Sequence, residues 1–234
     1  MKHFKLPVQS GIEIPKPPME QVKDWAKAHQ EVLAVGALLL LLLFVGVPYY
    51  LKSQRQTEKD ASNMLDMAGY YLNSAVDAKS GPFKTEQEKY QQSLETFQRV
   101  MNNYSGTPSS RIAQYYVGKC QYMLGQYPQA YASFDVAVGE LKGTPLSDAA
   151  ALGKILCMSV QDKTQEAIAL YETFLKERPD SFLVPEAKLG YSACLVKSGD
   201  KAKAIQVLES LAKDSAGTTP GHEAQRQLKG LKGA

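Results

Sequence analysis

The chain has 234 residues, of which 44% are hydrophobic and 22% charged, and its formal net charge is +3. This composition excludes a disordered chain and a protein with many membrane spans, and the near balance of charge argues against a nucleic-acid-binding surface. The three cysteines form no Cys-x-x-Cys pair, which argues against a disulfide framework and a thiolate zinc site.

The first predicted element is a membrane span at residues 32–51, VLAVGALLLLLLFVGVPYYL, which contains no charged residue. Twenty helical residues extend about 30 Å, the thickness of the hydrocarbon core of a bilayer. Trp25, Tyr49 and Tyr50 stand near its two ends, where such rings favour the headgroup region. A cleaved signal peptide is the alternative, but a long tail precedes the run and no small-residue cleavage pattern follows it. We therefore predict an uncleaved signal-anchor, in which Pro48 is placed to kink the exit.

The tail before the span, residues 1–31, bears on orientation. The tail carries five lysines and the segment after the span three basic residues, namely Lys2, Lys5, Lys16, Lys23 and Lys27 against Lys52, Arg55 and Lys59. The positive-inside rule therefore favours a cytoplasmic N-terminus and an exported C-terminal domain. Four prolines (Pro7, Pro15, Pro17 and Pro18) predict that the tail before residue 19 is extended.

Residues 52–234 contain an internal repeat with a period of 37 residues. Four sets of positions share this spacing: Cys120, Cys157 and Cys194; Ala113, Ala150, Ala187 and Ala224; Ala130, Ala167 and Ala204; and Phe97, Phe134, Tyr171 and Leu208. The tripeptide Gly106-Thr107-Pro108 also recurs at 143–145 and, more loosely, at 217–220. A fixed period between about 20 and 50 residues indicates a solenoid or a propeller.

Each repeat reads as two helices. Helical spacing of apolar residues predicts helices at 111–124 and 129–141, separated by Gly125, with Gly199 in the same role later. Each Thr-Pro pair predicts a helix start, in which the threonine caps and the proline takes the first position. Sustained period-2 alternation is absent, so we predict an all-α stack of antiparallel hairpins.

These residues resemble the tetratricopeptide repeat (TPR). Gly118, Ala130, Phe134 and Ala137 match its pattern, whereas Ile155 and Ser192 replace the glycine in the next two units. The resemblance implies a TPR-like α-solenoid behind an N-terminal transmembrane helix. The predicted parts are a degenerate unit at 57–104 (helices 57–79 and 85–103), full units at 108–141, 145–179 and 183–215, and a C-terminal capping helix at 219–231.

The repeat bears on which cysteines, histidines and charged residues are candidates for a catalytic or metal-binding role. The cysteines occupy one position of the repeat, where we expect small buried side chains. His3, His29 and His222 lie in separate regions, and no phosphate-binding, nucleophile or metalloprotease motif is present. We therefore expect no enzyme, cofactor, metal or small-molecule substrate. The charged residues Glu166, Glu172, Lys176, Glu177, Lys201 and Lys203 are expected on a solvated outer face.

The TPR resemblance implies that the first helix of each pair lines a concave groove. The candidate groove residues are Ile112, Tyr115, Lys119, Tyr122, Leu152, Leu156, Leu189 and Val196, with Met123, Ala149, Ser159, Val160, Glu186, Ala193 and Lys197 at further groove positions. Because these positions are mostly apolar, the groove suits a hydrophobic peptide or a partner helix better than a clamped carboxylate. The alternative is that these side chains simply fill a tightly wound superhelix.

One span followed by TPR units, together with Gln21–Lys27 and Leu33–Gly36, resembles the ancillary SecYEG translocon subunit (YfgM-like) family of bacterial envelopes. The resemblance implies an inner-membrane protein whose periplasmic TPR domain assists newly exported proteins. The stretch 97–134 also resembles TPR proteins of outer-membrane assembly and Tol–Pal systems. Two functions stay open: a tethered scaffold that binds exported clients or translocon partners, and a structural subunit of a stable envelope complex.

Overall fold

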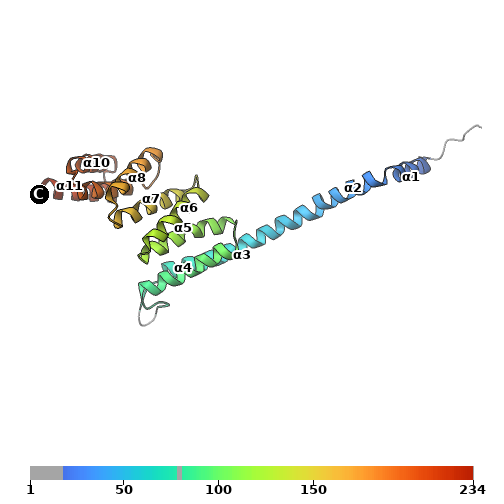
Figure 1. The fold of residues 1–234 in the computed structure, drawn as a ribbon, viewed down its shortest axis with the longest axis horizontal. Helices are drawn as coiled ribbons and strands as arrows, with labels where there is room; N and C mark the ends of the chain where they lie inside the picture. The colour runs from blue at the N-terminus through green and yellow to red at the C-terminus, as the bar shows by residue number, and fades with distance from the viewer. Residues whose placement is uncertain (1–17, 78–80, 234) are drawn as a thin grey trace, which may run out of the picture. The chain divides into compact units, whose positions relative to one another are not determined.

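The computed structural model describes residues 18–77 and 81–233, and the chain divides into two compact units, Met1–Arg55 and Gln56–Ala234. The described residues form helices and no strand, apart from an isolated bridge between Val76 and Phe83 (Figure 1). The all-α prediction is therefore confirmed.

The N-terminal unit contains α1 (Pro18–Ala28), α2 (Gln30–Leu41) and a π-helical turn, η1 (Leu42–Gly46), after which α3 (Val47–Asn73) begins. Pro18 is the first residue of α1 and not part of an extended tail, since proline suits the first turn of a helix. The expectation for Pro7, Pro15 and Pro17 falls outside the described residues.

The helical run from Gln30 to Asn73 is long and apolar enough to cross a membrane: its most apolar window has a mean hydropathy of 2.6, and no residue of that window is buried. The predicted span at 32–51 lies within this run. Pro48 has no N–H to donate and its ring displaces the carbonyl one turn earlier. The neighbouring Val47 N–H bonds to Leu42, five residues back, so the helix accommodates the proline through a π-turn.

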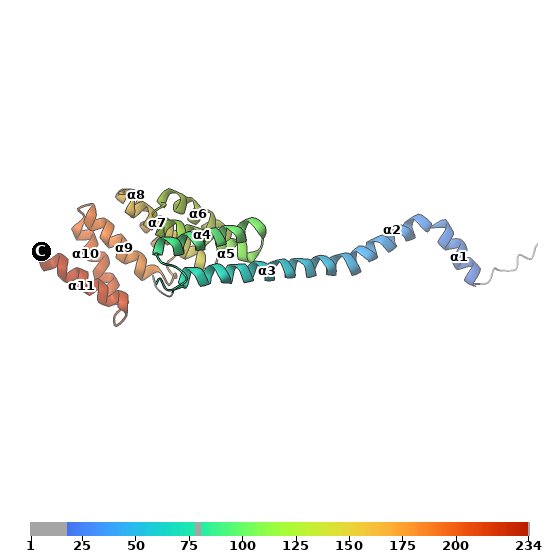
Figure 2. The same ribbon diagram turned by 90° about the horizontal axis from the view of Figure 1, so that it is seen from below.

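The second unit is built of antiparallel helix pairs stacked in chain order (Figures 1 and 2). After α3 its helices are α4 (Glu86–Asn103), α5 (Pro108–Met123), α6 (Tyr127–Glu140), α7 (Pro145–Val160), α8 (Thr164–Glu177), α9 (Val184–Lys197), α10 (Lys201–Asp214) and α11 (Thr219–Gly233). From α4 on, each helix contacts the next, and α5 also contacts α7, α7 contacts α9 and α9 contacts α11. The first helices of successive pairs therefore form one row, as a helical solenoid requires.

The positions that recur every 37 residues are buried in the structure. Phe97, Phe134, Tyr171 and Leu208 are all at most 4% exposed, and every alanine at the two repeated alanine positions is fully buried. The first position therefore holds a large apolar or aromatic side chain in every repeat, and the two alanine positions hold a small one, as close packing between helices requires.

The helix ends follow the predicted turn chemistry. The hydroxyls of Thr107 and Thr144 accept hydrogen bonds from the N–H groups of Ser110 (3.1 Å) and Ser147 (3.4 Å). Gly125 and Gly199 have φ of 74° and 91°, the left-handed conformation that ends a helix. The predicted helices at 111–124 and 129–141 begin at 108 and 127, because proline is tolerated in the first turn.

The first pair departs most from expectation, since α3 ends at Asn73 and not at residue 79. The side chains of Asn73 and Ser74 donate to the carbonyls of Gly69 and Tyr70, which competes with continuation of the helix. The pair is nonetheless joined to the repeats: Ala68 and Leu72 pack with Phe97, Val117 and their neighbours.

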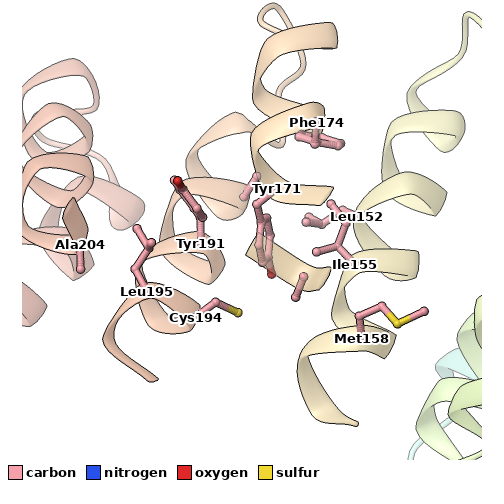
Figure 3. Close-up of a cluster of buried hydrophobic side chains, with 11 residues drawn as sticks. Leu152, Ile155, Met158, Tyr171, Phe174, Tyr191, Cys194, Leu195 and Ala204 are labelled. Atoms are coloured by element: carbon pink, nitrogen blue, oxygen red, sulfur yellow. The ribbon is translucent and has the colours of Figure 1, made fainter. Parts of the chain in front are cut away.

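The core continues from one pair to the next. Figure 3 shows Tyr171 of α8 between Leu152 and Ile155 of α7 on one side and Tyr191 of α9 on the other. Separate clusters of this kind follow one another along the stack, from α3–α5 to α9–α11.

Candidate functional site

In the first two full repeats one aromatic side chain sets the distance between successive first helices. The ring of Phe134 on α6 lies so close to α5 and α7 that a Cβ atom on Gly118 or Gly153 would come within 2.8 Å or 2.7 Å of it. Tyr171 takes the same place one repeat later, where a Cβ on Gly190 would lie 2.2 Å from its hydroxyl oxygen. Only residues without a side chain allow this approach.

Gly153 and Gly190 are positioning residues that the sequence interpretation missed. They stand one repeat apart and face the repeated aromatic, so their 37-residue spacing was a usable signal. In the first full repeat this position is Tyr116, whose ring stacks on Phe97 at a centroid distance of 5.0 Å. At this position α5 therefore carries a ring against the repeated aromatic, whereas α7 and α9 carry a glycine.

Beside Phe134 the row of first helices lines an open cavity of about 290 Å³. It is lined from α5 by Tyr115, Lys119, Tyr122 and Met123, from α7 by Ala149, Leu152, Gly153 and Leu156, and by Phe134 and Leu183. Small-molecule sites usually enclose roughly 300–1,000 Å³. This volume lies at the lower end of that range and is large enough for a few apolar side chains.

The lining is apolar and aromatic with one charge. Tyr115 and Tyr122 are half-buried, and burial raises the pKa of both phenols. The ring of Tyr115 lies 5.9 Å from that of Phe134, so Tyr115 supports the core as well as facing the cavity. Met123 (47%) and Leu156 (36%) are more exposed, and Lys119 is the charged residue of the lining. The site can therefore hold apolar side chains, with one cation for an acidic group.

Three of the eight candidate groove residues do not line this cavity. Ile112 lines a separate cavity with Leu141 and Leu146 near the start of α7. Leu189 packs toward the buried cluster of Leu208, Leu211 and Ala224. Val196 is 41% exposed on α9 but does not line the cavity beside Phe134. Leu183, which does line it, precedes α9 in a turn and stands 37 residues after Leu146, a spacing that the sequence interpretation did not use.

The cysteines are core residues, as predicted. Cys120 and Cys157 are fully buried and Cys194 is 6% exposed, and all three are free thiols. Burial raises the pKa of Cys120 to about 12 and that of Cys157 to about 11. A thiol of such high pKa is almost entirely protonated at neutral pH and is a poor nucleophile.

The charges expected on the outer face are exposed there, and two of them form an ion pair between helices. Lys203 of α10 donates to Glu172 of α8 at 2.6 Å, and the Tyr191 hydroxyl donates to the same carboxylate oxygen at 2.6 Å. The hydrogen bond from Lys203 lowers the pKa of Glu172. In residues 18–77 and 81–233 no group of three or more His, Cys, Asp or Glu side chains could hold a metal ion.

Comparison with known proteins agrees with the repeat fold described above. A model of the tetratricopeptide repeat-like domain matches residues 23–205, a region that includes the apolar run. No curated protein matches the chain.

Solved structures share the fold. TPR-like repeats of a putative kinesin light chain from Podosopora anserina, in a substituted form and an unsubstituted form, align with TM-scores of 0.57 and 0.56 at 14% identity, over 75% of this chain and 88% of theirs. A tetratricopeptide repeat protein from Parabacteroides merdae aligns with a TM-score of 0.55 at 12% identity, over 75% of this chain and 61% of its own. At such low identity these likenesses describe the fold.

Proposed function

The chain belongs to the tetratricopeptide repeat-like domain family, whose fold is typically a non-catalytic protein-interaction scaffold, and from that premise we propose that it captures protein partners beside a membrane. In this proposal an apolar segment of the partner enters the cavity between α5 and α7. The observation that carries it is the lining itself: Met123 and Leu156 stay partly exposed around a cavity that the aromatic row leaves open.

The groove chemistry selects the kind of partner. Its lining offers rings and aliphatic side chains with a single cation, Lys119, and so favours a hydrophobic peptide or the apolar face of a helix over an acidic tail. Capture by a few apolar side chains is weak in free solution. Tethering to the membrane raises the effective concentration of a weak binder where its partners emerge.

The membrane location rests on the apolar run within Gln30–Asn73 and on the excess of lysine before it. The resemblance to ancillary translocon subunits adds the finer proposal: an N-terminus in the cytoplasm, repeats in the periplasm, and exported proteins or translocon components as partners. Protease added to intact spheroplasts tests this orientation. Digestion of the repeats from outside supports it, and digestion only after the inner membrane is permeabilised contradicts it.

Site-specific photocrosslinking tests the groove. A photoreactive amino acid at position 156, in the cavity, is compared with one at 136, on the outer surface of α6, where Val136 is 49% exposed. We expect crosslinks to partner proteins from position 156 and few from 136. The reverse result would move the binding surface to the second helices.

The products of the same experiment separate the two functions. Many partners in small amounts indicate a scaffold for transient clients. One partner at equal stoichiometry indicates a structural subunit of a stable envelope complex.

A further inference from the structure

Helix α1 (Pro18–Ala28) has an apolar face that the rest of the described chain leaves uncovered. Met19, Val22 and Trp25 are 73%, 62% and 56% exposed. At 100° per residue these three side chains and Ala26 fall within about 120° of the helix circumference. The charged residues occupy the opposite side, in the order Glu20, Lys23, Asp24 and Lys27.

The helix is interrupted directly after α1. His29 has φ −116° and ψ 23°, outside the helical region, and α2 starts at Gln30. The His29 ring stacks on Trp25 at a centroid distance of 4.9 Å, and its Nδ1 lies 2.9 Å from the Trp25 carbonyl oxygen. Because of this interruption, the axis of α1 need not follow the axis of the apolar run. The stacked rings nevertheless keep Trp25 next to the start of that run.

We propose that α1 lies in the bilayer interface on the N-terminal side of the span, with Met19, Val22 and Trp25 inserted among the lipids. This rests on the proposed membrane span, because the start of that span holds α1 at the bilayer surface. A short amphipathic helix binds a membrane weakly by itself, but here the covalent connection supplies the local concentration.

The charges of α1 argue for lipid contact driven by apolar burial. Two lysines and two acidic residues cancel, so the helix has no net attraction to anionic lipid or to an acidic partner. Lys23 borders one edge of the apolar stripe, from where its ammonium group can reach the headgroups. Binding should therefore be equal on zwitterionic and anionic bilayers.

Trp25 is the single tryptophan of the chain and reports directly on α1. The full chain is reconstituted in phosphatidylcholine vesicles, and quenching of tryptophan fluorescence is measured with aqueous acrylamide and with lipids brominated at shallow and deep acyl positions. Two variants move the probe: Trp25→Phe/Met19→Trp along the apolar face, and Trp25→Phe/Glu20→Trp to the polar face one residue away.

An interfacial α1 places tryptophan at positions 25 and 19 at the same depth, protected from acrylamide several-fold and quenched by shallow brominated lipid. Position 20 is then open to acrylamide. A helix that instead points into water places position 19 about 9 Å farther out than position 25. Acrylamide then quenches positions 19 and 20 equally, which overturns the proposal.

A matched pair of substitutions checks the driving force. Val22→Asp and Lys27→Gln each change the net charge by the same amount, but only the first alters the apolar face. We expect Val22→Asp to expose Trp25 to acrylamide and Lys27→Gln to leave it protected, with and without phosphatidylglycerol in the vesicles. Equal effects of both variants would contradict insertion of the apolar face.

Alkaline carbonate extraction separates this proposal from the span on which it rests. If the chain stays in the membrane but acrylamide quenches Trp25, the interfacial helix is contradicted and the membrane anchor is supported. Release of the chain by carbonate contradicts the anchor itself.

Discussion

A Cβ atom on Gly153 of α7 would lie 2.7 Å from Cζ of Phe134 on α6, closer than any real side chain can approach. The same ring lies against Gly118 of α5, where a Cβ would come within 2.8 Å. A single aromatic ring thus spaces two consecutive first helices, and the cavity lined by Tyr115 and Leu156 opens beside it.

Gly153→Ala should destabilise the repeat domain. The added methyl forces Phe134 or α7 to move, which costs about 1–3 kcal/mol, whereas removing a helical glycine contributes about 1 kcal/mol in the other direction. We expect a net loss of about 1 kcal/mol, measured as a lower denaturation midpoint in urea by circular dichroism.

Gly139→Ala is the matched control, since Gly139 is an exposed glycine of α6 with no atom within 4 Å of an added Cβ. This change should stabilise the domain by about 0.5–1 kcal/mol. If both variants gain stability alike, the contact between Phe134 and Gly153 does not limit the approach of the helices.

The repeat could be predicted well from the sequence because large buried side chains recur every 37 residues. The positions of Phe97, Phe134, Tyr171 and Leu208 must fill one kind of seam, and repetition makes that requirement visible. Threonine caps and turn glycines act within a few residues, so they also could be read locally.

What the sequence did not predict depends on contacts between distant elements. Leu189 and Leu156 share a helical face in the pattern, yet Leu189 packs toward Leu208 and Leu156 lines the cavity. Which side chains of a common face stay open therefore depends on packing between different helices, which the pattern within one helix does not show. Leu183 reaches the cavity from a turn, although Leu146, its counterpart one repeat earlier, lines a different cavity.

Tyr115→Ser and Leu156→Ser should separate folding from binding. Tyr115 is half-buried and packs in the cluster around Phe134, so its loss should cost about 2 kcal/mol of folding stability. Leu156 is 36% exposed, so its loss should affect folding less. If it contacts the partner, affinity should fall about tenfold, a change of about 1.4 kcal/mol.

Val136→Ser on the outer surface of α6 is the control for this pair and should change neither quantity. Partner capture by the full chain and its thermal melting are the two measurements. Unchanged capture by Leu156→Ser would show that the cavity is not where the partner binds.

Thr144→Ala should loosen the start of α7. The Thr144 hydroxyl accepts a hydrogen bond from the Ser147 N–H and donates one to the Leu141 carbonyl at 2.7 Å, so it satisfies groups on both sides of the turn. Loss of such a cap costs about 1 kcal/mol.

Thr173→Ala is the comparison for the cap, because Thr173 is exposed within α8 and donates to the Ala169 carbonyl. Alanine is a better helix former there, so the free energy of unfolding of the Thr173→Ala variant should equal that of the parent chain or exceed it by a few tenths of a kcal/mol. Faster hydrogen exchange in the first turn of α7 should accompany Thr144→Ala alone, and its absence would contradict the capping role.

The buried phenol of Tyr171 and the buried thiol of Cys120 should make the domain less stable at alkaline pH. Burial raises the pKa of the Tyr171 phenol from 10.0 to about 12 and that of the Cys120 thiol from 9.0 to about 12. The unfolded chain releases these protons at the ordinary pKa while the folded chain still holds them. Stability is therefore fully present below about pH 9 and falls as the pH rises toward about 12.

Tyr171→Phe isolates the share of the phenol. This variant should lose stability less steeply than the parent between about pH 10 and 12, because one of the groups that deprotonates on unfolding is gone. Tyr70→Phe, at a ring that is 65% exposed, should keep the slope of the parent chain. The urea midpoint measured at several alkaline pH values gives both slopes. Equal slopes for all three chains would contradict a protonated, buried Tyr171, because a phenol that titrates alike in both states contributes no pH dependence.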